Sequence, residues 1–156
     1  MGAGTVIATA IAITLLIITG YVLIGGTLST ARVVALAQQA AAAKEVEKIH
    51  TRIEILNATT NSTDARTYIE VKNTGSVVLG DFDHMEVYLL QGLIPRTFTS
   101  IPGNYTISPD GVNPGLLDPD EVANISVSYD QTLGDPTWVK VTTANGVSAS
   151  KYTMIV

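Results

Sequence analysis

The chain has no cysteine, and this absence excludes several classes of site at once. Without thiols there is no disulfide framework, no thiol catalysis, no iron–sulfur cluster and no cysteine-based zinc site. Any folded domain must therefore be stabilised by its apolar core. A domain of about 100 residues can supply such a core without disulfides.

Histidine is nearly as scarce, with only His50 and His84 present. The sequence also lacks a Ser-His-Asp arrangement in a supporting context, a glycine-rich phosphate loop and an HExxH motif. His84 stands beside Asp81 and Asp83, a grouping that can bind a metal, although a solvated turn is the more common role of such neighbours. The sequence predicts no catalytic residue and no cofactor, and a membrane-tethered enzyme is the least favoured function.

A second acidic cluster contains Asp118, Asp120 and Glu121. Its carboxylates are the hard oxygen ligands that calcium prefers, but the spacing of an EF-hand is missing. We expect an exposed turn before a strand, with Pro119 setting the bend. No metal site is predicted.

Charged side chains are absent from residues 1–31 and unevenly divided over the rest of the chain. Up to Leu56 there are four basic and three acidic residues, whereas from Asn57 onward there are five basic and eleven acidic residues. An acidic domain is a poor partner for nucleic acid, because phosphate backbones require basic patches. The negative charge instead favours solubility outside the membrane.

The uncharged N-terminal segment, MGAGTVIATAIAITLLIITGYVLIGG, is nearly all apolar or small. About 20 such residues span a bilayer as a helix, and the whole uncharged stretch would reach about 45 Å. It does not fit a secretory signal peptide, because no basic region precedes it and the apolar run is too long. Leu16 and Ile17 lie near its centre and are predicted to pack against lipid or neighbouring helices.

The helix is predicted to continue past the glycines at 25–26, because the next segment is rich in Ala, Gln, Glu and Lys. Val46, Ile49, Ile53 and Leu56 then recur at heptad-like spacing, which gives a narrow apolar stripe for a partner helix. Too few heptads follow to establish a coiled coil. A rigid amphipathic stalk and specific helix bundling are both consistent with this segment.

Beyond the helix, the pattern changes to short alternating segments separated by turns. Seven or eight such strands with no helical period predict an antiparallel, immunoglobulin-like β sandwich. We therefore expect a transmembrane or filament-core helix and stalk at 1–50 and a sandwich domain at 51–156. The expected strands are Thr51–Asn57, Thr67–Asn73, Val77–Leu79, Met85–Leu90, Arg96–Ser100, Ala123–Tyr129, Trp138–Thr143 and Val147–Ile155.

The last two of these strands flank Ala144-Asn145-Gly146, the strongest hairpin signal in the sequence. All six prolines are expected between strands, where a missing N–H does no harm. Trp138 is expected to anchor the core, with a surface binding role as the alternative.

Four Asn-x-Ser/Thr sequons occur, whereas seven asparagines in this composition would give about one by chance. None lies in the apolar segment. Two are expected in the loop after the first strand, where a sugar can be displayed. The last is expected within a strand, which makes it the weakest of the four candidates. Glycosylation is predicted, with an unmodified Thr-rich strand domain as the alternative. The acceptors are Asn57, Asn61, Asn104 and Asn124.

Two signals disagree about the orientation of the chain in a membrane. Basic residues lie only after the apolar run, which by the positive-inside rule places that side in the cytoplasm. Acidic residues interleave with them, however, and a large β domain with sequons favours the exterior. We expect the C-terminal domain outside the cell.

The combination of segments resembles the archaeal flagellin superfamily. The resemblance rests on the N-terminal apolar helix, the Ala/Gln/Glu-rich continuation, RIEILNAT, YIEVKNTGSVVL and the terminal WVKVTTANGVSASKY, and it covers nearly the whole chain. Within the superfamily, the chain is most similar to the archaellum accessory proteins F and G, and especially to F. The resemblance implies one membrane helix and an immunoglobulin-like domain outside the cell.

This resemblance implies a non-enzymatic, stator-like component of the archaellum that contacts the surface layer. The alternative is an archaellin or type IV pilin-like filament subunit whose helices bundle in the filament core. The sequence begins at MGAGTV and shows no basic leader for a prepilin-type peptidase. An unprocessed gene product of this form favours the accessory protein, whereas a mature chain whose leader has been removed favours the filament subunit. Expected partners are the membrane, further copies or other archaellum or pilus subunits, and a surface-layer protein. The expected location is the cell membrane or an extracellular filament.

Overall fold

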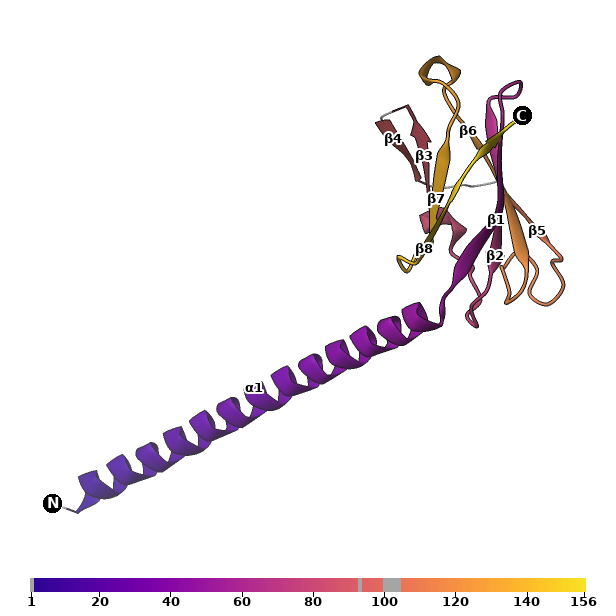
Figure 1. Ribbon diagram of the computed structural model, residues 1–156. Coiled ribbons are helices and arrows are strands. Elements are labelled where there is room, and N and C mark those ends of the chain that lie inside the picture. Colours follow the sequence, from indigo (N-terminus) through magenta and orange to yellow (C-terminus); the bar gives the residue numbers. More distant parts are fainter. Residues whose placement is uncertain (1, 93, 100–104) are drawn as a thin grey trace. The chain divides into compact units, whose positions relative to one another are not determined.

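The computed structural model has one long N-terminal helix followed by a β sandwich, which confirms the predicted fold class (Figure 1). It describes residues 2–92, 94–99 and 105–156, and for 94–99 only the backbone. The chain separates into two compact units, Met1–Ala43 and Lys44–Val156. Helix α1 (Ala3–His50) therefore contributes about its last two turns to the second unit.

Helix α1 has 48 residues, which corresponds to a length of about 72 Å. It continues without a break through the glycines at 25–26, as predicted, because strong helix formers follow on the C-terminal side. By length and composition it can cross a membrane. None of its residues is buried.

Two sheets face each other in the second unit, with an apolar core between them (Figure 1). Their strands are β1 (Ile53–Asn61), β2 (Arg66–Asn73), β3 (Glu86–Gln91), β4 (Ile94–Thr99), β5 (Tyr105–Ser108), β6 (Val122–Ser128), β7 (Trp138–Thr142), β8 (Ser148–Tyr152) and β9 (Met154–Ile155). The strand orders are β5-β6-β2-β1-β9 and β4-β3-β7-β8. Neighbours are antiparallel except for β1 and β9, which run parallel. Two short 3-10 helices are η1 (Phe82–His84) and η2 (Gln131–Leu133).

Three predicted strand assignments differ from the structure. Val77–Leu79 is not a strand, and Leu79 makes only an isolated bridge to Leu117. Strand β5 lies where no strand was predicted. The long terminal strand is divided at Thr153, whose N–H donates to the Thr137 carbonyl at 3.1 Å. This contact lets the chain leave the sheet of β7 and β8 and join the sheet of β1 as β9.

The core is mostly aliphatic, and strand alternation determines which residues enter it. Val139 and Val141 of β7 are fully buried, whereas Trp138 is half-buried on the outer side of the same strand. The prediction that Trp138 anchors the core is therefore wrong. Buried aliphatic side chains of this kind each stabilise the fold by about 1.5–3 kcal/mol.

The predicted hairpin is confirmed. Gly146 has φ +84°, and the Thr143 N–H donates to the Val147 carbonyl at 2.8 Å. The expectation for proline is wrong for Pro95, which lies within β4 opposite Leu90. Strand β4 is an edge strand with β3 as its one neighbour, and edge strands tolerate proline because the missing N–H can face away from the sheet. Ser100 and Pro102 lie outside the described residues.

Candidate anchoring helix and its junction with the sandwich

Apolar side chains cover all sides of α1 along its uncharged part, and they are exposed. The predicted packing residues Leu16 and Ile17 expose 74% and 65% of their surface. A helix that is apolar all round is stable only where lipid or other helices cover it. The surface of this segment therefore requires a bilayer or a helix bundle around it.

The threonines of the apolar segment are compatible with such surroundings. Each hydroxyl donates to a backbone carbonyl three or four residues earlier, at 2.8 to 3.1 Å. A polar group that is satisfied within its own helix avoids the cost of an unpaired group in an apolar medium. The residues are Thr5, Thr9, Thr14, Thr19, Thr27 and Thr30.

The apolar stripe predicted along the stalk exists only in part. Val46 and Ile49 are exposed on α1, at 55% and 71%. The helix ends at His50, so Ile53 instead begins β1 and is buried in the sandwich core. Leu56 lies at a β-bulge of the same strand. The stripe prediction is therefore wrong beyond Ile49, because the helix stops before a second heptad is complete.

Thr51 ends the helix and joins it to the sandwich. Its N–H and its hydroxyl both donate to the Glu47 carbonyl, each at 2.9 Å. The hydroxyl also accepts a hydrogen bond from Nδ2 of Asn145 at 2.7 Å. Asn145 belongs to the β7–β8 hairpin, so this turn holds the end of α1 to the sheet. Thr51 is buried, and its side-chain bonds are partly shielded from water.

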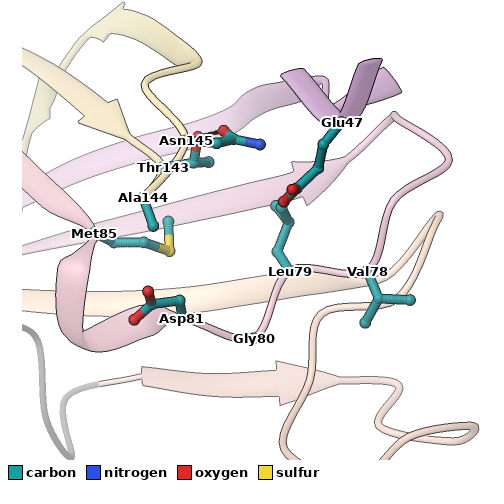
Figure 2. A pocket seen from close by; sticks show the side chains of 9 residues that line it. All are labelled: Glu47, Val78, Leu79, Gly80, Asp81, Met85, Thr143, Ala144 and Asn145. Atoms are coloured by element: carbon teal, nitrogen blue, oxygen red, sulfur yellow. Dashed lines mark hydrogen bonds between the residues drawn. The ribbon is translucent and has the colours of Figure 1, made fainter. Parts of the chain in front are cut away.

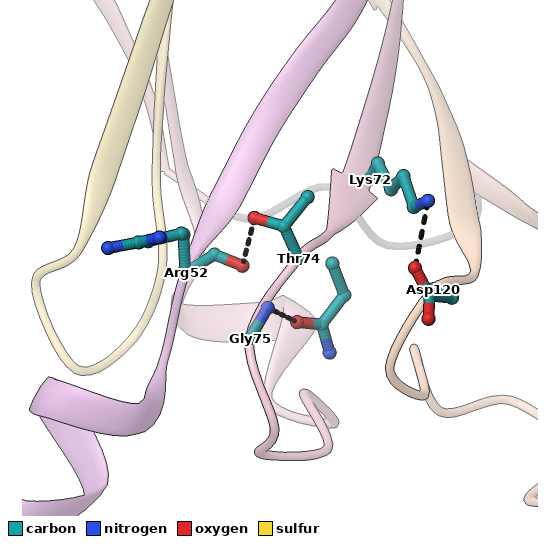
Figure 3. Close-up of polar contacts among 6 residues, drawn as sticks. Arg52, Lys72, Thr74, Gly75 and Asp120 are labelled. Carbon is teal, nitrogen blue, oxygen red and sulfur yellow. Dashed lines mark hydrogen bonds and ion pairs between the residues drawn. The ribbon is translucent and has the colours of Figure 1, made fainter.

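A second turn, at residues 73–76, binds the same junction. The N–H groups of Thr74 and Gly75 both donate to the Arg52 carbonyl at 2.9 Å, and the Ser76 N–H donates to the His50 carbonyl at 3.0 Å. Figure 3 shows this turn beside Arg52. The His50 carbonyl is one of the last carbonyls of the helix, which have no partner within it. The turn therefore caps the helix and fixes the start of β1.

Only glycine fits at position 75. A Cβ there would lie 2.5 Å from the Arg52 nitrogen and 2.5 Å from the His50 carbonyl oxygen, and both are backbone atoms. Asn73 shapes the turn from inside the sandwich, where it is fully buried. Its Nδ2 donates to the carbonyls of Val77 and Leu117 at 2.8 and 3.0 Å, and its Oδ1 accepts from the Gly75 N–H at 3.0 Å.

An exposed ion pair between Lys72 and Asp120, at 2.8 Å, lies next to this turn (Figure 3). Exposed pairs of this kind contribute about 0–1 kcal/mol. The turn is therefore held mainly by Asn73 and by its backbone bonds.

A pocket opens where the final helical turns meet the sandwich, and Glu47, Leu79, Met85 and Asn145 are among the residues that line it (Figure 2). Its volume is about 60 Å³. Pockets for small-molecule ligands commonly measure about 300–1,000 Å³. This pocket can therefore hold a few water molecules but no substrate or cofactor of ordinary size.

The predicted exposed turn around Asp118 and Glu121 is wrong for both residues, which are buried. The Asp118 carboxylate accepts from the N–H and Nδ2 of Asn113 at 3.0 and 2.8 Å. The Glu121 carboxylate accepts from the N–H groups of Gly111 and Asp118 at 3.2 and 3.0 Å. These carboxylates organise their own loop. Within the residues that the structure describes, no group of three acidic, histidine or cysteine side chains is placed to hold a metal.

His84 lies in an exposed turn, as predicted. Its Nδ1 lies 2.6 Å from Oδ1 of Asp81. The hydrogen bond to Asp81 and the negative charge of that carboxylate raise the pKa of His84 above 6.5. The pair is solvated, so it forms a surface contact and not a buried reactive group.

The structure places three of the four sequons. Asn57 lies within β1 and Asn61 is its last residue, so the prediction that both lie in the following loop is wrong. Strand β1 extends to Asn61 because it pairs with β2 along its whole length, past a bulge after Ile55. Asn124 lies within β6, as expected, and its side chain is exposed. Asn104 is outside the described residues.

Comparison with known proteins identifies the family. The model of archaeal-type flagellins matches residues 2–152, which include the helix, the junction and the sandwich as far as the end of β8. The chain belongs to the archaeal-type flagellin family. This match confirms the resemblance predicted from the sequence, and the family consists of structural archaellum components and not of enzymes.

Individual proteins resemble this archaeal-type flagellin to different extents. An uncharacterized protein of Archaeoglobus fulgidus is 27% identical over 154 residues, which cover 96% of this chain and 94% of that protein. The periplasmic stator protein FlaG of the Sulfolobus acidocaldarius archaellum has a TM-score of 0.44 at 17% identity, covering 65% of this chain and 97% of FlaG. The complex of the stator proteins FlaF and FlaG from the same organism gives 0.47 at 17% identity, covering 65% and 87%.

Proposed function

We propose that this archaeal-type flagellin is a non-enzymatic, static component of the archaellum machinery. Helix α1 anchors it in the cell membrane, and the sandwich lies outside, in contact with the surface layer. The observation that carries the proposal is the charge-free part of α1, which is apolar on every side and satisfies its own threonine hydroxyls. A bilayer supplies the surroundings that such a helix needs.

The junction supports a static role. Three backbone bonds from the 73–76 turn and one side-chain bond from Asn145 hold the first residues after α1 and the last helical carbonyl. A flexible linker would dissipate a force applied to the sandwich, whereas a hydrogen-bonded junction transmits it to the final turns of the helix. A component that resists the motion of others needs such a connection.

The polar groups of the sandwich support a role without catalysis. Among the described residues, the buried carboxylates of Asp118 and Glu121 are occupied by backbone N–H donors. The two histidines are exposed, and His84, whose pKa is raised by Asp81, belongs to a surface pair. A reactive site requires polar groups that converge in a cleft, and the residues above are instead used to organise loops.

A filament subunit is the second candidate, and one observation favours it. The uncharged part of α1, from Ala3 to Ala31, is about 43 Å long, whereas the hydrocarbon core of a bilayer is about 30 Å thick. In a filament core, identical helices would bury the whole uncharged length of α1, including the part that is longer than the hydrocarbon core. In this case the partners are further copies of the chain, and the location is an extracellular filament.

Fractionation of native cells distinguishes the two candidates. Cells are sheared to release filaments, and the chain is quantified in the filament fraction and in the washed membranes. We expect it chiefly in the membranes, with the surface-layer protein recovered alongside it after mild crosslinking. Recovery chiefly in the sheared filaments would overturn the anchored role in favour of the filament subunit.

A further inference from the structure

The register of the five-stranded sheet places parts of three sequons in one row. Asn57 of β1 pairs with Glu70 of β2, Glu70 pairs with Asn124 of β6, and Asn124 pairs with Thr106 of β5. Thr106 is the hydroxyl residue of the sequon that begins at Asn104. Two acceptor amides and one sequon hydroxyl therefore lie side by side across four strands.

All of these side chains are on the outer face of the sheet. In β6 the flanking Ala123 and Ile125 are buried in the core, so alternation directs Asn124 outward, where it is exposed. In β1 the buried Ala58 and Thr60 likewise direct Asn57 and Asn61 outward. The three described acceptors thus share one face, although they come from two strands and are far apart in sequence.

The next row supplies the other sequon hydroxyls. Thr59 and Ser126, which complete the sequons of Asn57 and Asn124, both pair with Tyr68 of β2. Tyr68 is 42% exposed, so its ring projects from the sheet between them. An exposed aromatic ring is a flat apolar surface with a polar tip, which suits contact with a partly apolar molecule such as a sugar ring.

A shallow hollow of about 450 Å³ lies over this region. The short side chains of Asn124, Thr106 and Ser126 line it, together with the longer side chains of Tyr68, Glu70 and Arg66. Arg66 is held in place by a 2.8 Å bond from its guanidinium to the Ser126 hydroxyl. Asn124 is exposed, and its side chain makes no hydrogen bond to the described residues, so its amide is available in the lining of the hollow.

We propose that Asn124 carries an N-linked oligosaccharide whose first sugars occupy this hollow against Tyr68. The inference rests on the proposed exterior location of the sandwich. In the transfer, the Asn124 amide nitrogen forms a bond to the anomeric carbon of a polyprenyl-phosphate-linked oligosaccharide. The bond from that carbon to the carrier phosphate breaks, and the proton lost by the amide is taken up by the phosphate that leaves.

The outer faces of the two sheets differ in their glycosylation sequons. In the described residues, every sequon acceptor is on the outer face of the five-stranded sheet, and none is on the outer face of β3, β7 and β8. Sugars are bulky and solubilising. A glycan on Asn124 therefore covers the face that already has Thr, Ser and Asn side chains at its surface.

The test uses the full chain purified from archaeal cells that perform N-glycosylation. Cleavage after Asp and Glu releases residues 122–130, which contain Asn124 and no other sequon. We expect mass spectrometry to find this peptide with an added oligosaccharide. Ser126→Ala should abolish the added mass, and Ser126→Thr should restore it. The matched control Ser128→Ala, on the same face of the same strand but outside the sequon, should leave it unchanged.

Two further measurements separate the parts of the inference. An unmodified 122–130 peptide overturns the assignment of Asn124, wherever the domain is located. Release of the sandwich by protease from intact cells reports on the exterior location independently, so the two failures are distinguishable. To test the contact with Tyr68, the urea midpoint of unfolding is compared between glycosylated and unglycosylated protein. The sugar should raise this midpoint in the wild type but not in Tyr68→Ala. An equal rise in both proteins would show that the sugars do not rest on Tyr68.

Discussion

Replacing Gly75 with alanine tests the junction between α1 and the sandwich. The new Cβ would lie 2.5 Å from two backbone atoms, the Arg52 nitrogen and the His50 oxygen. Neither atom can move away like the end of a flexible side chain. The 73–76 turn must therefore separate from the junction, which breaks the bonds from Thr74, Gly75 and Ser76 to the carbonyls of Arg52 and His50.

The cost follows from those three backbone bonds. Each contributes about 1 kcal/mol net, so we expect Gly75→Ala to lower the free energy of unfolding of the sandwich by about 3 kcal/mol. This is a large part of the 5–15 kcal/mol that stabilises an ordinary domain. With a urea dependence of about 1–3 kcal/mol per molar, the midpoint should fall by about 1–3 M.

Urea titration of the full chain in detergent, followed by the fluorescence of Trp138, measures this change. Gly111→Ala is the matched control, because no heavy atom outside its chain neighbours lies within 4 Å of the added Cβ. The control should stay within about 0.5 kcal/mol of the wild type. If Gly75→Ala unfolds at the same urea concentration as Gly111→Ala, the junction is not held as the structure indicates.

Three other changes have defined outcomes. Leu16→Asp should prevent membrane retention, because a charge near the bilayer centre costs about 2.5–3.5 kcal/mol. The control Leu16→Ala should be retained, and membrane flotation measures both variants. Asn73→Ala removes the three hydrogen bonds of a buried side chain and should destabilise the sandwich by about 3 kcal/mol in urea titration. Hydrogen bonds from the hydroxyls of Tyr129 and Ser62 hold the pKa of Asp135 below its ordinary 3.8. A lowered carboxyl pKa stabilises the fold above that ordinary value and loses its contribution as pH falls below it, so Asp135→Asn should show a smaller acid-side loss of stability than the wild type.

The sequence predicts the parts of the fold that depend on local chemistry. The uncharged run gives α1, and the alternating pattern gives most strands of the sandwich. Asn145-Gly146 gives the β7–β8 turn because Gly146 adopts φ +84°, which glycine tolerates.

Features that depend on partners distant in sequence were not predictable. The helical spacing of Val46 and Ile49 continues to Ile53, but bonds from the 73–76 turn and from Asn145 end the helix between Ile49 and Ile53. The break at Thr153 likewise depends on Thr137, and no local signal marks it. Trp138 was misplaced because its size suggested burial, whereas the strand phase is set by Val139 and Val141.

The candidate sites show the same division. The sequons are visible in the sequence, but the row formed by Asn57, Glu70 and Asn124 depends on strand register. The requirement for glycine at position 75 is also invisible locally, because the close atoms belong to His50 and Arg52. Asparagine is common in turns, so the sequence does not mark Asn73 of the same turn as special. Its complete burial in the structure reveals its structural role.

Labelling of single cysteines in intact cells tests the central claim, that α1 anchors a sandwich outside the membrane. The chain has no cysteine, so each introduced thiol reports one position. Val112 is 77% exposed in a loop of the sandwich, and Gly2 lies just before the apolar helix. A membrane-impermeant maleimide should label Val112→Cys on intact cells and Gly2→Cys only after lysis. Labelling of Gly2→Cys on intact cells, or of Val112→Cys only after lysis, would contradict the account.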